Sequence, residues 1–132
     1  KRVCYFERFQ LPWNHTKQRI VNAVGDVECV IDSTGVGDSI TEDMQSLLPR
    51  VEGFKFSSTS KQQLMQLLSN EIGTKDVRFP DNEIVDELLS FEYEHTRTGV
   101  KYNAPYGLHD DCVMALALAL NAHRNQPGFG VW

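Results

Sequence analysis

An aspartate suited to metal binding stands at the end of the second predicted strand. Val27–Ile31 is apolar enough for a buried strand, and it leads directly into Asp32 and a loop that contains Gly35 and Gly37. Open α/β sheets bind ligands at the carboxyl ends of their strands, where loops are free to converge. Asp32 is therefore a candidate catalytic acid or metal ligand, and its alternative role is to cap the loop. A phosphate cradle is the weaker interpretation, because the loop lacks the Lys-Ser/Thr ending of a P-loop and the third glycine of a dinucleotide fingerprint.

A second acidic position is the pair Asp110 and Asp111, which follows His109 and precedes the apolar run Cys112–Leu120. Acidic residues at a helix N-terminus are stabilised by the helix dipole and by free N–H groups, so we expect one of the pair to cap a helix. Adjacent helical residues point about 100° apart, which would turn the other carboxylate toward the sheet. A carboxylate in that position needs a cation or a donor to offset its desolvation. His109 is a candidate ligand or proton carrier, and its alternative role is helix entry.

Carboxylate oxygens favour Mg²⁺ or Mn²⁺ over zinc. Two such ions about 4 Å apart can activate a water molecule and stabilise the leaving oxygen of a phosphodiester. Asp32, Asp110 and Asp111 therefore predict a two-metal site for phosphodiester hydrolysis, which is chemistry performed on nucleic acid.

The composition fits one globular domain, residues 1–132, with a polar tail at about 123–132. The chain has 132 residues, of which 41% are apolar and 23% are charged, and its longest apolar run is far too short to span a membrane. A cytoplasmic protein without membrane contact is predicted. The net charge of −5 argues against a broad basic surface, so any DNA contact is expected to be local. Three scattered cysteines predict reduced thiols rather than a zinc site.

Strands and helices are expected to alternate along the chain. Strands are predicted at Arg2–Phe9, Val27–Ile31 and Gly53–Ser57, and a hairpin at Phe91–Arg97 and Val100–Asn103 with Thr98-Gly99 as its turn. Helices are predicted from about Thr16 to Gly25, from the glycine loop to Pro49, from Thr59 or Ser60 through Ile72, around Ile84–Leu89, and from His109 or Asp110 to about Ala122. The last helix is apolar nearly all round, which indicates an α/β fold with helices on both faces of a mixed sheet.

Two motifs, in this order, resemble the nuclease domain of large terminases. They are Val30-Ile31-Asp32-Ser33-Thr34-Gly35-Val36-Gly37-Asp38 and Leu108-His109-Asp110-Asp111-Cys112-Val113-Met114-Ala115-Leu116-Ala117. The stretch Phe56-Ser57-Ser58-Thr59-Ser60-Lys61 and the hairpin before the last helix extend the resemblance over most of the chain. It implies a ribonuclease H-like fold and a Mg²⁺- or Mn²⁺-dependent endonuclease that cuts concatemeric double-stranded DNA. Asp32 would then carry the second metal-binding acid of the family, and Asp110 or Asp111 the third.

The same resemblance places the hairpin near the active site. Its candidate DNA-facing residues are Tyr93, His95, Arg97, Lys101 and Tyr102, to which Lys61 is added from the stretch before the third predicted helix. The alternative is a solvated hairpin. The resemblance also suggests a portal protein and a small terminase subunit as partners.

One departure concerns the first metal-binding aspartate, which the family carries on an initial strand. This sequence opens at Lys1-Arg2-Val3 without it, so we expect a fragment that lacks its first strand or strands, with an incomplete metal site and an exposed sheet edge. Two alternatives therefore stand beside the nuclease. One is a non-catalytic docking module that binds another packaging component, and the other is a nuclease resembling the Holliday-junction resolvases of the same superfamily.

Overall fold

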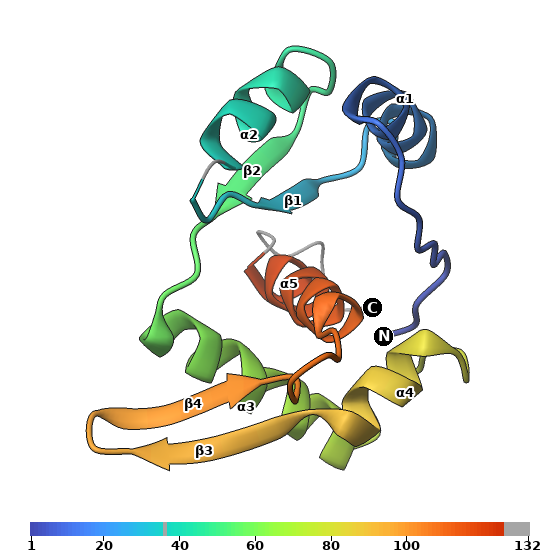
Figure 1. Cartoon of the computed structure of the whole chain (residues 1–132). Coiled ribbons are helices and arrows are strands. Elements are labelled where there is room, and N and C mark those ends of the chain that lie inside the picture. The colour runs from blue at the N-terminus through green and yellow to red at the C-terminus, as the bar shows by residue number, and fades with distance from the viewer. Residues whose placement is uncertain (36, 126–132) are drawn as a thin grey trace. The chain divides into compact units, whose positions relative to one another are not determined.

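The computed structural model describes residues 1–35 and 37–125, and most of the predicted tail lies outside them. The chain divides into two compact units, one made of Arg8–Phe56 and the other of Lys1–Glu7 with Ser57–Trp132. Each unit has its own helices and its own two-stranded sheet (Figure 1). Among the described residues, none of the helices combines the length and the apolar character that a membrane span requires.

The unit Arg8–Phe56 is built on a parallel pair of strands. Its elements are α1 (Trp13–Val24), β1 (Cys29–Asp32), α2 (Gly37–Gln45) and β2 (Val51–Phe54). The register pairs Cys29 with Val51 and Asp32 with Phe54. Helix α2 packs on both strands through Met44, which is fully buried, and Thr41. The alternation of strand and helix predicted for this part of the chain is confirmed, with each boundary shifted by a few residues.

Gly53 marks the closest approach of α2 to the sheet. A Cβ atom at this position would lie 3.0 Å from Ser33 Oγ and 3.1 Å from Thr41 Cγ2, and both of these residues are buried. Only a residue without a side chain leaves room for this packing, so the glycine fixes the distance between α2 and β2.

Helix α1 is held to α2 by polar contacts. None of the described α1 side chains is buried. The indole Nε1–H of Trp13 and the Nζ of Lys17 each donate to Asp43 Oδ2 at 2.9 Å. These hydrogen bonds, the one from Lys17 first, lower the pKa of the Asp43 carboxyl group below its usual range.

The other unit is centred on α5 (Asp111–Asn125), which packs against α3 (Ser58–Gly73) and α4 (Glu83–Ser90). Figure 1 shows α3 beside the hairpin formed by β3 (Glu92–Thr96) and β4 (Gly99–Asn103). The core of this unit consists mainly of apolar side chains from the three helices, namely Leu64, Met65, Leu68, Ile84, Cys112, Val113, Met114, Leu116, Ala117, Leu118 and Leu120. The predicted burial of the last helix is confirmed.

Helix α3 begins with a capping box, one or two residues earlier than expected. Ser57 Oγ accepts from Ser60 N at 3.1 Å, and Ser60 Oγ accepts from Ser57 N at 2.8 Å. The helix was predicted to start at Thr59 or Ser60 and begins at Ser58, with Ser57 as its N-cap and Ser60 as the N3 partner of the capping box.

The hairpin β3–β4 is confirmed, with its turn one residue earlier than predicted. Arg97 and Thr98 form the loop, and Gly99 begins β4 with φ at 146°, a value that L side chains rarely adopt. The register places Tyr93 opposite Tyr102 and Glu94 opposite Lys101.

The predicted strand Arg2–Phe9 is wrong. Arg2 forms only an isolated parallel bridge with Arg78, supported by hydrogen bonds from Val3 N to Arg78 O and from Arg78 N to Lys1 O. Val, Tyr and Phe favour strands only where a neighbouring strand takes up the backbone groups. Beyond this bridge, residues 3–9 form no strand in the part of the chain that the structure describes. The described residues hold two separate two-stranded sheets where one mixed sheet was expected.

Candidate metal centre

Asp32 lies exposed at the carboxyl end of β1, as the sequence predicts. Its Oδ1 accepts from Thr34 N at 2.9 Å, and Thr34 Oγ1 in turn accepts from Phe56 N at 2.9 Å. Ser33 N donates to Phe54 O at 2.9 Å, which extends the hydrogen bonding between β1 and β2 by one residue. The loop therefore orients one carboxylate oxygen of Asp32 without enclosing the group. Loop capping and ligand binding are compatible roles for this residue.

Asp110 and Asp111 occupy different environments at the start of α5. Asp110 is partly buried, with 26% of its side chain exposed, and its Oδ2 accepts from Lys61 Nζ at 3.1 Å. Asp111 is 75% exposed, and its Oδ2 lies 3.8 Å from His109 Nδ1. The cation that a partly buried carboxylate requires is thus Lys61 for Asp110, whereas Asp111 faces solvent. His109 is exposed beside Asp111.

The cap of α5 comes from Glu87 on α4. Glu87 Oε2 accepts from Cys112 N at 2.6 Å and from Val113 N at 3.2 Å. These are the N–H groups that a capping Asp110 would use, so the expectation of a local cap is wrong for Asp110. Sequence reasoning missed Glu87. The signal for it was a charged residue three positions after Ile84, on the apolar side of a short helix.

The candidate acids are distributed over both units. Asp32 belongs to the unit Arg8–Phe56, whereas His109, Asp110 and Asp111 belong to the other, together with Lys61. Within each unit, the described residues bring together no group of three or more His, Cys, Asp or Glu side chains that could hold a metal ion. The assignment of these residues as metal ligands stays a prediction.

The candidate DNA-facing residues of the hairpin are mostly exposed. Arg97 lies in the loop and Lys101 stands opposite Glu94, both accessible to solvent. Tyr102 is half-buried and stacks on Phe91, with ring centroids 6.3 Å apart and planes at 14°. The rings of Tyr93 and His95 pack edge to face, with their centroids 5.6 Å apart. The hairpin thus carries aromatic and cationic groups that are available to a ligand, although Glu92 and Glu94 reduce its positive charge.

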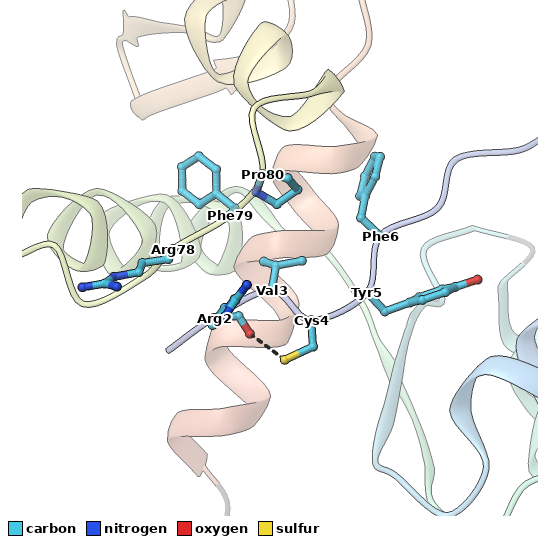
Figure 2. A pocket seen from close by; sticks show the side chains of 8 residues that line it. All are labelled: Arg2, Val3, Cys4, Tyr5, Phe6, Arg78, Phe79 and Pro80. Carbon is cyan, nitrogen blue, oxygen red and sulfur yellow. Dashed lines mark hydrogen bonds between the residues drawn. The ribbon is translucent and has the colours of Figure 1, made fainter.

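A surface cavity of about 520 Å³ lies elsewhere in the unit that contains α5, between residues 2–6 and 78–80. Figure 2 shows that its side chains do not converge, because Arg78 and Tyr5 point to opposite sides. No carboxylate lines it among the described residues, so it does not offer the chemistry of a magnesium site.

Comparison with known proteins connects this geometry to a family. No family model matches the chain. The large terminase subunits of Thermus phage G20c and Thermus virus P23-45 are each 34% identical over 113 residues, covering 80% of this chain and 22% of each relative. The chain thus spans about a fifth of the length of these curated relatives.

Solved structures give the same result. The large terminase nuclease of the thermophilic phage G20c with bound magnesium matches with a TM-score of 0.72 and 33% identity, over 84% of this chain and 62% of that one. The large terminase nuclease domain of Thermus phage P74-26 matches with a TM-score of 0.71 and 26% identity, over 92% and 66%. These matches show that the chain has the fold of large terminase nuclease domains, which is ribonuclease H-like. The chain is a homologue of the large terminase subunits in their nuclease part.

Proposed function

We propose that this chain is a divalent-metal-dependent DNA endonuclease that hydrolyses phosphodiester bonds at a two-metal site. The observation that carries the proposal is the match to a terminase nuclease solved with bound magnesium, at 33% identity and a TM-score of 0.72. Asp32 and either Asp110 or Asp111 are the proposed ligands, and His109 is the proposed proton carrier or further ligand.

The donor set of the chain fits Mg²⁺ or Mn²⁺. Asp32 and Asp111 present exposed carboxylates, and Asp110 holds a partly buried one whose Oδ2 is bonded to Lys61. These are hard oxygen donors of the kind that Mg²⁺ and Mn²⁺ prefer. Bound divalent ions supply activation of water and stabilisation of the charge that develops on the phosphodiester. The chain itself orients the proposed ligands. Thr34 N–H, for example, donates to Asp32 Oδ1.

DNA contact is proposed for Arg97, Lys101 and Tyr102 on the hairpin, and for Lys61. Arg97 and Lys101 are exposed cations in a chain whose net charge is −5, so phosphate contacts are concentrated rather than spread over a surface. Lys61 is bonded to Asp110, and in this position it lies beside one of the proposed metal ligands. A phosphate held by a metal ion on Asp110 would therefore lie within reach of Lys61.

The function of the whole protein is proposed from its relatives. As a large terminase homologue, it would cut concatemeric viral DNA in the host cytoplasm during genome packaging. A portal protein and a small terminase subunit are its proposed partners. Co-purification of each partner with the chain, with and without DNA, tests this assignment.

Nicking of supercoiled plasmid in Mn²⁺ tests the nuclease assignment and decides between the two aspartates. Asp110→Asn and Asp111→Asn each remove one charge and keep the side-chain volume, and Asp86→Asn, an exposed acid on α4, is the matched control. We expect the control to nick at the rate of the unsubstituted chain, and the variant that removes a ligand to lose at least about tenfold relative to it.

Two outcomes would contradict the proposal in different ways. Normal nicking by both variants would show that neither aspartate binds the metal. If the chain neither binds Mn²⁺ nor nicks DNA, the docking module becomes the better account. Faster cutting of a four-way junction than of a linear duplex would favour the alternative of a resolvase-like nuclease.

A further inference from the structure

Glu87 is a buried acid that the proposed chemistry does not use. Only 6% of its surface is exposed, and it lies on α4 near the buried Ile84. A single oxygen, Oε2, accepts both backbone N–H groups at the start of α5, from Cys112 at 2.6 Å and from Val113 at 3.2 Å. The start of α5 is therefore fixed by a neighbouring helix rather than by its own sequence.

This arrangement determines which groups the carboxylate of Asp110 contacts. Asp110 stands immediately before α5, and its backbone oxygen already accepts the first helical hydrogen bond, from Met114 N at 2.9 Å. An aspartate in that position would normally turn its carboxylate back onto the N–H groups two and three residues later. Glu87 takes both groups, and the carboxylate of Asp110 instead reaches Lys61.

We propose that Glu87 is a positioning residue of the metal site, which caps α5 from a neighbouring helix and so keeps the carboxylate of Asp110 out of the cap, on the side of Lys61, where the proposed site would use it. The inference rests on the proposed function. Without Glu87, the N–H groups of Cys112 and Val113 would donate to the Asp110 carboxylate as a local cap. The helix would keep its fold, and the proposed metal site would lose the Asp110 carboxylate as a ligand.

Three substitutions of Glu87 separate its hydrogen bonds from its charge. Glu87→Ala removes both. Glu87→Asp keeps the charge but withdraws the oxygen by one methylene group, whereas Glu87→Gln keeps one acceptor oxygen at the same reach and removes the charge. Because Oε2 accepts from both Cys112 N and Val113 N, a glutamine whose amide oxygen takes this place retains these two hydrogen bonds. Glu83→Ala, an exposed acid on the same helix, is the matched control.

The measurement is the affinity of the full chain for Mn²⁺ by titration calorimetry, with amide exchange at Cys112 and Val113 as a report on the cap. Loss of an outer contact that orients a metal ligand typically costs 10- to 100-fold in affinity. We expect a loss of at least about tenfold in Glu87→Ala and Glu87→Asp, and an affinity within about threefold of the original in Glu87→Gln and Glu83→Ala. Amide exchange at Cys112 and Val113 should follow the same order.

The inference is overturned if Glu87→Asp, with a native circular dichroism spectrum, binds Mn²⁺ as the unsubstituted chain does. It is also overturned if Glu87→Gln loses as much affinity as Glu87→Asp, because the charge rather than the cap would then matter. If Glu87→Ala does not fold, the comparison of the aspartate and glutamine variants still decides the question. Failure of the proposed function appears differently, as absent Mn²⁺ binding in the unsubstituted chain, and the inference falls with it.

Discussion

The three thiols of the chain differ in their access to solvent. Cys4 is exposed, Cys29 is half-buried and Cys112 is buried. Burial raises the pKa of the Cys29 thiol, so less of it is present as the reactive thiolate at neutral or mildly basic pH. We expect Cys4 to be alkylated first by iodoacetamide at pH 8, with Cys29 and Cys112 much slower, as measured by peptide mass spectrometry. Equal rates at Cys4 and Cys29 would contradict the described burial.

At the residue level, the sequence could predict which side chains carry charge but not what they contact. The position of Asp32 at a strand end follows from local patterns, and the structure confirms it. The capping role was wrong for Asp110, because Glu87, which takes the N–H groups, comes from another helix. Capping rules consider the few residues around a helix start, and a partner that is distant in sequence lies outside their reach.

The contact between α1 and α2 should depend on pH through Asp43. Because the folded pKa of this carboxyl group is lowered, its stabilising contribution is complete above the unfolded pKa, about 4, and disappears as the pH falls through the lower folded value. We expect the NMR signal of the Trp13 indole N–H to stay constant from neutral pH to about 4 and to move only below it. Asp43→Ala should release α1 at neutral pH as well. A transition of this signal between pH 5 and 7 would contradict the lowered pKa of the Asp43 carboxyl group.

The packing of α2 on β2 should not tolerate a side chain at position 53. Gly53→Val places branched atoms where even a Cβ lies 3.0 Å from Ser33 Oγ, so we expect a loss of about 1–3 kcal/mol in the free energy of unfolding. Gly73→Ala is the control, because a Cβ on this helical glycine has open space around it. That variant should be neutral or stabilising by less than about 1 kcal/mol. Urea denaturation of both variants measures the difference, and an unchanged Gly53→Val would contradict the close approach.

At the element level, periodic patterns predicted the helices well and the strands only in part. Helices α3 and α5 were expected because their apolar residues recur at helical spacing, and both are present. Arg2–Phe9 has the composition of a strand, yet the structure leaves it extended with one bridge. Strand formation depends on a pairing partner elsewhere in the chain, and composition does not reveal whether such a partner is present.

At the level of the whole molecule, the acids that resemble the terminase nuclease motifs lie in two compact units, Asp32 in one and the Asp110-Asp111 pair in the other. Motif order predicted that these residues serve one chemistry, and that assignment stays a prediction. The prediction of individual metal ligands goes further than sequence patterns reach, because ligation depends on distances between side chains rather than on their order.

Mn²⁺-dependent nicking of supercoiled plasmid by Asp32→Asn tests the central claim most directly. The substitution keeps the oxygen that accepts from Thr34 N and removes the charge that a metal requires. Asp26→Asn, an exposed acid in the loop before β1, is the matched control. We predict that Asp32→Asn loses at least about tenfold in rate with an unchanged circular dichroism spectrum, while the control nicks normally. Equal rates for Asp32→Asn and the unsubstituted chain would contradict the role of Asp32 in the nuclease site.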